Sequence, residues 1–248
     1  AGPSLDRAME TLADPSTRDR AVLIATQTVL GTLLARGIKP HFVVALDYHE
    51  ISRRFYEGLT ADAVRGVTLV VEPKANPAIL EAFPGAIRCV GDDVLDAVLG
   101  ESLATPKGEI PPGATVAHLA YGLARFIGCD PVILVGQDLA FTDGQYYAHH
   151  AAIHRVWSNE LNAFNTLEML EWERIVRMRS MLRTAPAVGG GEVYTDEQMH
   201  TYRVQFEREF QRDAARGLTT IDASEGGAAK SHTSVMSLRD ALDAHAKA

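Results

Sequence analysis

Short apolar runs alternate with amphipathic stretches through the first half of the chain. The runs are rich in β-branched and aliphatic residues and are bounded by turn-forming residues, which is typical of buried strands. The stretches between them repeat apolar residues at helical spacing, and two of them close at a glycine, Gly37 and Gly128. After a first helix at Leu5–Leu12, this pattern predicts strands at 20–26, 41–47, 66–71, 86–91 and 131–136, and helices at 28–38, 50–59, 76–83, 94–103 and 115–128.

The second half of the chain has a different pattern. Residues 151–183 predict one or two long helices rich in Glu and Arg, and a Gly-rich break, "TAPAVGGGEV", follows. A long helix then begins after an N-cap at Thr195 or Asp196 and ends at Gly217, before a strand at 218–224 and a last helix at 237–248. The large apolar side chains of the first of these regions are predicted to be core (Trp157, Phe164, Met169, Trp172).

Strands that alternate with helices form βαβ units, so the fold class predicted is α/β, doubly wound around a mainly parallel sheet with a helical insertion. We expect an α/β domain over residues 1–150, the insertion over 151–217, and a return to the α/β domain over 218–248. The opening "AGPSLD" is a turn that leads directly into a helix, whereas such turns normally follow a strand. We therefore expect the chain to be a fragment of a longer protein.

Composition narrows the function classes. The 248 residues carry a formal net charge of −8, which argues against a partner that is duplex nucleic acid, and only the stretch Arg174–Arg183 is locally basic. Two cysteines are too few for a disulfide framework. We see no apolar run long enough for a membrane span and no signal peptide, and so we expect a cytoplasmic protein.

Candidate chemistry gathers where the predicted strands end. Ligands of open parallel sheets bind beyond the carboxyl ends of the strands. That edge would collect "ATQ" (25–27), "LDYHE" (46–50) and "GQDLAFTDGQYY" (136–147), together with the opening "GPS". "PGAT" (112–115) adds a helix N-terminus suited to an anion such as phosphate, although "GPSL" and "PGAT" are equally ordinary turns and N-caps.

Two acidic residues and three histidines stand out along this edge. Asp47 and Asp138 each follow an apolar strand, where a carboxylate either acts on a ligand or caps a neighbouring helix. His150 and His154 have the i, i+4 spacing of a metal pair, but no HExxH motif or cysteine pair accompanies them. We therefore predict no metal site, and interpret His149, His150 and His154 as solvent-facing or ligand-edge groups. GxGxxG, GxxxxGK[ST] and GxSxG are all missing from the sequence. The signatures of dinucleotide-binding oxidoreductases, P-loop proteins and α/β-hydrolases are therefore absent.

Five segments together resemble one family over essentially the whole chain. They are "GPSLD", "GIKPHFVVALD", "GATVAHLAYGLARFIGCDPVILVGQDLAFTDGQYYA", "YTDEQMHTYRVQFEREF" and "IDASEGGAAKSHT". They resemble the central domain of the motility accessory factors (Maf), which are flagellin glycosylation proteins, within the wider family named for MptE-like 6-hydroxymethylpterin diphosphokinases. More distantly, the pattern is similar to bacterial sialyltransferases that use CMP-sialic acid, which implies a Rossmann-like, sialyltransferase-like fold.

The resemblance implies roles for individual residues. Asp138 and Tyr147 would be catalytic, with Tyr147 helping the phosphate of CMP to leave. Thr26 stands where the sialyltransferases have Asn, and His232 stands where the family reads Gly. The remaining positions would bind the substrate (Gly2, Pro3, Ser4, Thr26, Gln27, Asp47, Gly113, Ala114, Thr115, Gly136).

Three functions remain open at this point. The first is a glycosyltransferase-like transferase that moves a nucleotide-activated nonulosonic, sialic-acid-like sugar from a CMP-sugar donor to Ser or Thr of flagellin or another protein acceptor, without a cofactor. Its general base would be Asp138 or a nearby histidine. The second is a diphosphokinase that uses Mg²⁺ and ATP, with Asp47 and Asp138 on the metal and phosphates. The third is a non-catalytic nucleotide-binding or scaffold module.

Overall fold

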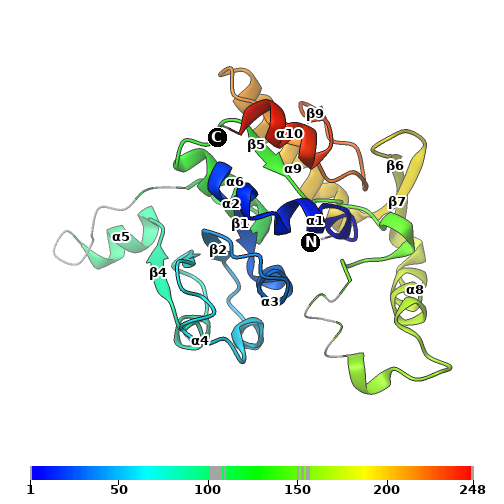
Figure 1. The fold of residues 1–248 in the computed structure, drawn as a ribbon, viewed down its shortest axis with the longest axis horizontal. Helices are drawn as coiled ribbons and strands as arrows, with labels where there is room; N and C mark the ends of the chain where they lie inside the picture. Colours follow the sequence, from blue (N-terminus) through cyan, green and yellow to red (C-terminus); the bar gives the residue numbers. More distant parts are fainter. Residues whose placement is uncertain are drawn as a thin grey trace. The chain divides into compact units, whose positions relative to one another are not determined.

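The computed structural model describes residues 2–100, 108, 110–149, 151, 154 and 157–246. The chain forms two compact units, Val22–Cys129 and, from both ends of the chain, Ala1–Ala21 with Asp130–Ala248. Each contains a parallel sheet, and Figure 1 labels most of the strands. The predicted division at residues 150 and 217 groups the chain differently from these units, and its boundaries stay a prediction.

The unit Val22–Cys129 is built on a four-stranded parallel sheet in the order β1-β2-β3-β4. The strands are shorter than the apolar runs that predict them: β1 is Ile24–Thr26, β2 Phe42–Ala45, β3 Thr68–Val71 and β4 Ala86–Cys89. The helices between them are α3 Gln27–Ala35, α4 Pro77–Ala82, α5 Asp93–Leu99 and α6 Val116–Phe126. Residues 50–59, predicted as an ordinary helix, contain the 3₁₀ helix η1 at Glu50–Tyr56.

Helices cover both faces of this sheet, as the doubly wound prediction requires. Alternate residues of a strand point to opposite faces. One face packs with α3, η1 and α4 in a buried cluster that includes Leu30, Val43, Ala45, Tyr56, Leu69, Val71 and Ile79. The other face packs with α6 through Val44, Val70, Leu119 and Leu123. Full burial of each of the larger aliphatic side chains stabilises the fold by about 1.5–3 kcal/mol, so these alternating runs fix which strand residue faces which helix.

The other unit holds the parallel sheet β5-β8-β9. Its strands are β5 Val132–Leu134, β8 Thr220–Asp222 and β9 Ser234–Val235, the last of which the sequence pattern does not predict. Residues of α1 (Leu5–Ala13) and α10 (Leu238–His245) pack with Ile133, Ile221 and Ala223 of this sheet. A short helix, α2 Pro15–Arg20, follows α1, so Arg20 ends a helix rather than beginning a strand.

Residues 151–217 depart from the prediction in two respects: the helices are shorter than predicted, and a β-hairpin is present. The described part contains the 3₁₀ helices η3 Ser158–Glu160 and η4 Arg179–Met181 and the helix α8 Leu167–Arg177. The predicted Gly-rich break is the turn of an antiparallel hairpin, β6 Leu182–Pro186 with β7 Glu192–Asp196. The helix after it, α9 Glu197–Ala214, begins at the predicted N-cap Asp196, whose carboxylate accepts the Met199 amide proton at 2.7 Å.

The predicted core of this region is only partly correct. Trp157 is buried, but Phe164, Met169 and Trp172 are 89%, 54% and 55% exposed. Phe164 lies in a turn before α8. Met169 and Trp172 lie on α8, a helix with only one buried stripe, and Leu170, Glu171 and Ile175 occupy that stripe.

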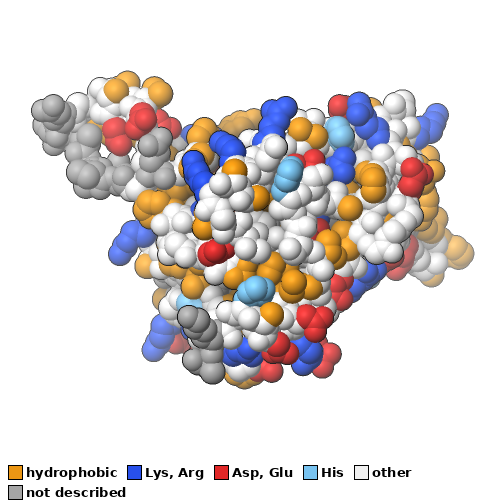
Figure 2. Space-filling model, turned by 90° about the horizontal axis from the view of Figure 1, so that it is seen from above, with side chains coloured by type: hydrophobic (Ala, Val, Ile, Leu, Met, Phe, Trp, Pro, Cys, Tyr) orange, Lys and Arg blue, Asp and Glu red, His pale blue; other side chains and the backbone are white. Residues whose placement is uncertain are grey.

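Two findings bear on partners. Within the described residues, every helix is too short or too polar to cross a bilayer. On the face in view in Figure 2, basic side chains are interspersed with acidic and apolar ones.

Candidate functional site

Asp138 is a buried connection at the end of β5. Asp138 is 1% exposed, and its carboxylate accepts three hydrogen bonds. The Ser4 backbone N–H donates to Oδ2 at 3.1 Å, the Ser4 hydroxyl donates to Oδ1, and the Thr142 hydroxyl donates to Oδ2. One carboxylate therefore joins the opening Gly-Pro-Ser turn, the end of β5 and the turn at Thr142.

Glycines allow the backbone to approach Asp138 from two sides. A Cβ at Gly2 would overlap the Asp138 carboxyl group, and a Cβ at Gly227 would overlap the Asp138 backbone. The Gly2 amide donates to the Gly136 carbonyl at 2.7 Å, and the Ala228 amide donates to the Asp138 carbonyl at 2.9 Å. The structure thus brings together four predicted site residues: Gly2, Ser4, Gly136 and Asp138.

This arrangement changes what the opening turn offers a ligand. The start of a helix attracts negative charge, and at α1 that charge comes from Asp138 of the protein itself, through the Ser4 amide and hydroxyl. Pro3 lies in the same turn, where its carbonyl accepts the Asp6 amide proton at 3.1 Å. The substrate-binding roles of Gly2, Pro3 and Ser4 stay predictions.

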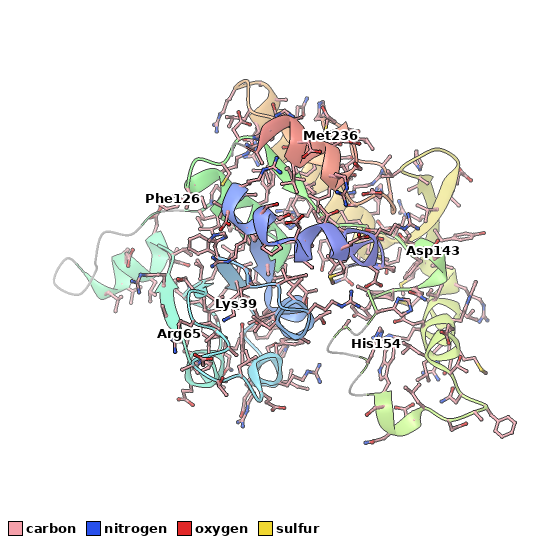
Figure 3. The ribbon with its side chains drawn as sticks, viewed as in Figure 1. Lys39, Arg65, Phe126, Asp143, His154 and Met236 are labelled. Atoms are coloured by element: carbon pink, nitrogen blue, oxygen red, sulfur yellow. The ribbon has the colours of Figure 1, made fainter. Side chains whose placement is uncertain are left out.

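Tyr147 lies in a cluster of aromatic side chains that also holds a buried ion pair. Its ring contacts Tyr146, with centroids 4.5 Å apart, and meets the His154 ring edge-on at 6.4 Å. His154 Nε2 is 2.8 Å from Glu171 Oε1, and both side chains are more than nine-tenths buried. Figure 3 shows His154 beside α8, the helix that carries Glu171. Burial, together with Tyr147 and Asp196 nearby, raises the pKa of the Tyr146 hydroxyl.

His149 forms a second pair with a carboxylate. Asp6 Oδ2 lies 2.9 Å from both the backbone nitrogen and Nδ1 of His149. Thus each described histidine of the 149–154 segment contacts a carboxylate, rather than facing solvent alone. His150 lies outside the described residues. In the described part of the chain, no group of three or more His, Cys, Asp or Glu residues could hold a metal ion.

In the unit Val22–Cys129, a hydrogen bond joins Gln27 and Asp47, which follow the ends of β1 and β2. The Gln27 amide donates to Asp47 Oδ2, which also accepts from the Ser52 hydroxyl at 2.8 Å. The Tyr56 hydroxyl donates to Gln27 Oε1 at 3.0 Å, and burial, with Asp47 next, raises the pKa of Tyr56. Thr26, the N-cap of α3, contacts Thr28 through their hydroxyls at 3.1 Å.

The "PGAT" segment of the same unit forms the start of α6. Thr115 is the N-cap, and its hydroxyl lies 3.4 Å from the His118 nitrogen and 2.8 Å from His118 Nδ1. Gly113 lies so close to His118 that a Cβ would overlap the His118 side chain. Ala114 stands between Gly113 and Thr115 in the chain. The ordinary capping role is therefore present, while phosphate binding here stays a prediction.

The sequence placed Thr142 within the ligand-edge segment 136–147 but gave it no role, and it missed Glu171. Thr142 stands four residues after Asp138, and only the turn between them brings the two side chains together. Glu171 left a clearer signal, because it lies at helical spacing between Leu170 and Ile175 on the buried stripe of α8. A carboxylate among core positions requires a partner, and the nearby histidines supply one.

A comparison with known protein families identifies the family of this chain. The family model described as "6-hydroxymethylpterin diphosphokinase MptE-like" matches residues 1–144, which is more than half of the chain. The chain belongs to the MptE-like family. No curated protein matches it.

A solved structure extends the likeness of the fold to nearly the whole chain. The Maf glycosyltransferase of Magnetospirillum magneticum AMB-1 matches over 95% of this chain with a TM-score of 0.67 and 21% sequence identity. The match covers 32% of that protein. The predicted likeness to the Maf fold is therefore confirmed.

Proposed function

We propose that this chain is a glycosyltransferase-like domain, which transfers a nonulosonic sugar from a CMP-sugar to a hydroxyl of flagellin or another protein. The observation that carries the proposal is the likeness of fold to a Maf glycosyltransferase along 95% of the chain. In each unit, polar groups follow the ends of parallel strands, β1 and β2 in one and β5 in the other. This supports the proposal, since a parallel sheet binds ligands at that edge.

Sugar transfer requires a group that stabilises the leaving phosphate and a base that takes the proton of the acceptor hydroxyl. When the sugar leaves CMP, negative charge develops on the phosphate, and the Tyr147 hydroxyl would stabilise it. The acceptor hydroxyl needs a base. Of the two predicted sources, His154 is better suited than Asp138, because the Asp138 carboxylate already accepts three hydrogen bonds, whereas His154 Nδ1 has no partner among the described residues.

A diphosphokinase is the second candidate, and the family description favours it. Such an enzyme would use Mg²⁺, which prefers carboxylate oxygens and water. Asp47 and Asp138 are the predicted ligands, but hydroxyl or amide donors point at both: Gln27 and Ser52 at Asp47, and Ser4 and Thr142 at Asp138. Among the described residues, donors occupy both oxygens of Asp138 but only Oδ2 of Asp47, so Asp138 as arranged does not fit the metal.

Calorimetric titration with CMP and with ATP, each with and without Mg²⁺, separates the candidates. For a sugar transferase, CMP binds without metal, and Tyr147→Phe and Thr115→Ala both weaken that binding. Ser237→Ala is the matched control, because it removes an N-cap from α10 outside the predicted site. ATP binding that requires Mg²⁺ and is lost in Asp47→Asn would favour the diphosphokinase. Binding of neither nucleotide would favour a scaffold module.

A further inference from the structure

Glu171 is a buried carboxylate that holds two functional segments at once. Its residue is 1% exposed and lies on α8. Oε1 is 2.8 Å from His154 Nε2, and Oε2 accepts the Tyr146 backbone proton at 2.8 Å. Both oxygens are therefore used, one on the histidine and the other on the residue directly before Tyr147.

The pairing selects one protonation form of the His154 ring. A carboxylate oxygen accepts, so the ring nitrogen that faces it carries the proton. His154 Nδ1 is buried and has no hydrogen-bond partner among the described residues. Placing the proton on Nδ1 would bury an unpaired N–H and turn the Nε2 lone pair toward the carboxylate. Both effects disfavour that form, and the ring keeps a bare lone pair on Nδ1.

We propose that Glu171 is a positioning residue, which fixes His154 as the Nε2-protonated form and holds the Tyr146–Tyr147 segment against it. This inference rests on the proposed transfer function. Nδ1 is buried, so the acceptor must displace the side chains that cover it. The acceptor oxygen then bonds to the anomeric carbon and gives its proton to Nδ1, while the bond from that carbon to the phosphate oxygen breaks and CMP leaves with the electron pair. Glu171 then faces an imidazolium, which its charge stabilises. The proton is later released to water.

The alternative to a positioning role is a purely structural one, because a buried His–Glu pair also stabilises the packing of α8. A structural role of this kind affects the free energy of unfolding but does not depend on which ring nitrogen carries the proton. The form of the ring and the pH dependence of transfer therefore distinguish the two roles.

The first test uses the unmodified chain. Long-range ¹H–¹⁵N correlation spectra of histidine-labelled protein report which nitrogen is protonated, and His154→Gln identifies the signals of His154 by their loss. We expect the neutral ring to be protonated at Nε2. A neutral ring protonated at Nδ1 overturns the inference, and this result needs neither a substrate nor a variant of Glu171.

The second test compares Glu171→Gln with Glu173→Gln. An amide that accepts the Tyr146 proton must turn its NH₂ group toward His154, which drives the proton to Nδ1. We expect the ring form to change and kcat to fall about 10²-fold or more, with the KM for the CMP-sugar little changed. The decline of the rate at low pH, where protonated His154 cannot act as a base, should also be lost. Glu173 lies on the same helix, is half-exposed and pairs with Arg177 at the surface, so its variant should retain both properties.

The failures of the two proposals differ. Transfer that proceeds equally well in Glu171→Gln and Glu173→Gln overturns the role of Glu171 and leaves the transferase standing. If the unmodified protein shows the expected ring form but transfers no sugar, the proposed function fails, and with it the catalytic use of His154.

Discussion

His232 is a residue whose backbone is better suited to another amino acid. Its φ is 62°, in the left-handed region that favours glycine, and its side chain is exposed. The family resemblance leads us to expect Gly at this position, and glycine adopts this backbone conformation without strain. A non-glycine residue pays about 1–2 kcal/mol for this conformation.

We therefore predict that His232→Gly stabilises the protein. The gain should be roughly 0.5–1 kcal/mol, because the greater entropy of glycine in the unfolded chain offsets part of the relief. Chemical unfolding measures the change. His232→Ala is the control, since alanine keeps the strained backbone and should show no comparable gain. Equal stability of His232→Gly and His232→Ala would refute the explanation.

Gly227 is required for a close approach as well as for its backbone conformation. Its φ is 82°, and an added Cβ would overlap the backbone of Asp138. Gly189, in the hairpin turn, has a similar φ of 88° but nothing near its missing Cβ. We predict that Gly189→Ala costs about 1–2 kcal/mol, whereas Gly227→Ala costs several-fold more or prevents folding. Thermal unfolding compares them, and equal losses would mean that the approach to Asp138 is not tight.

At the scale of elements, periodicity located most helices and strands but not all of them. The runs at 41–47 and 66–71 gave the correct strands because both faces of that sheet are buried, and β8 was found for its apolar pattern. The hairpin β6–β7 was missed, because the glycines at 189–191 were interpreted as a break between helices. The strands on either side are mostly exposed and lack an apolar pattern. Contacts such as Glu171 with His154 join distant segments, and no local pattern reports them.

A buried ion pair anchors the segment that follows β8. Lys230 Nζ lies 2.7 Å from Asp222 Oδ2, and both side chains are fully buried. We predict that Lys230→Met destabilises the protein by about 3–5 kcal/mol, because Asp222 loses its counter-charge. The double variant Lys230→Met with Asp222→Leu should recover much of this loss.

The exposed pair of Arg177 with Glu173 provides the control for that prediction. Arg177→Met should change the free energy of unfolding by no more than about 0.5 kcal/mol. Urea unfolding measures all three variants. A loss below about 1 kcal/mol in Lys230→Met would show that water reaches Asp222 after the change.

Helix α9 carries a group whose titration should appear in the stability of the protein. Burial raises the pKa of Glu209 to about 7, with Asp213 adding to the effect and Arg212 opposing it. Because the pKa is raised above that of the unfolded chain, the folded state binds the proton more tightly, and stability falls as pH rises from about 4.5 to 7. We predict that Glu209→Gln removes this decline. Thermal unfolding from pH 4.5 to 8 would contradict it if both proteins kept the same slope.

At the scale of the whole molecule, sequence and structure agree on the class of fold and on its relatives. The family model covers residues 1–144, and the solved Maf structure extends the likeness to 95% of the chain. The two comparisons carry different activities in their names. The residues within the fold must therefore decide between them, because one fold supports many reactions.

The most direct measurement presents both sets of substrates to the same preparation. One mixture holds a CMP-activated nonulosonic sugar with an acceptor protein, and the other holds ATP with 6-hydroxymethylpterin. Each is assayed for nucleotide release in Mg²⁺ and again in EDTA. Our account predicts CMP release that EDTA does not abolish and that falls in Tyr147→Phe and Glu171→Gln. Release of AMP from ATP, dependent on Mg²⁺ and accompanied by no CMP release, would contradict it.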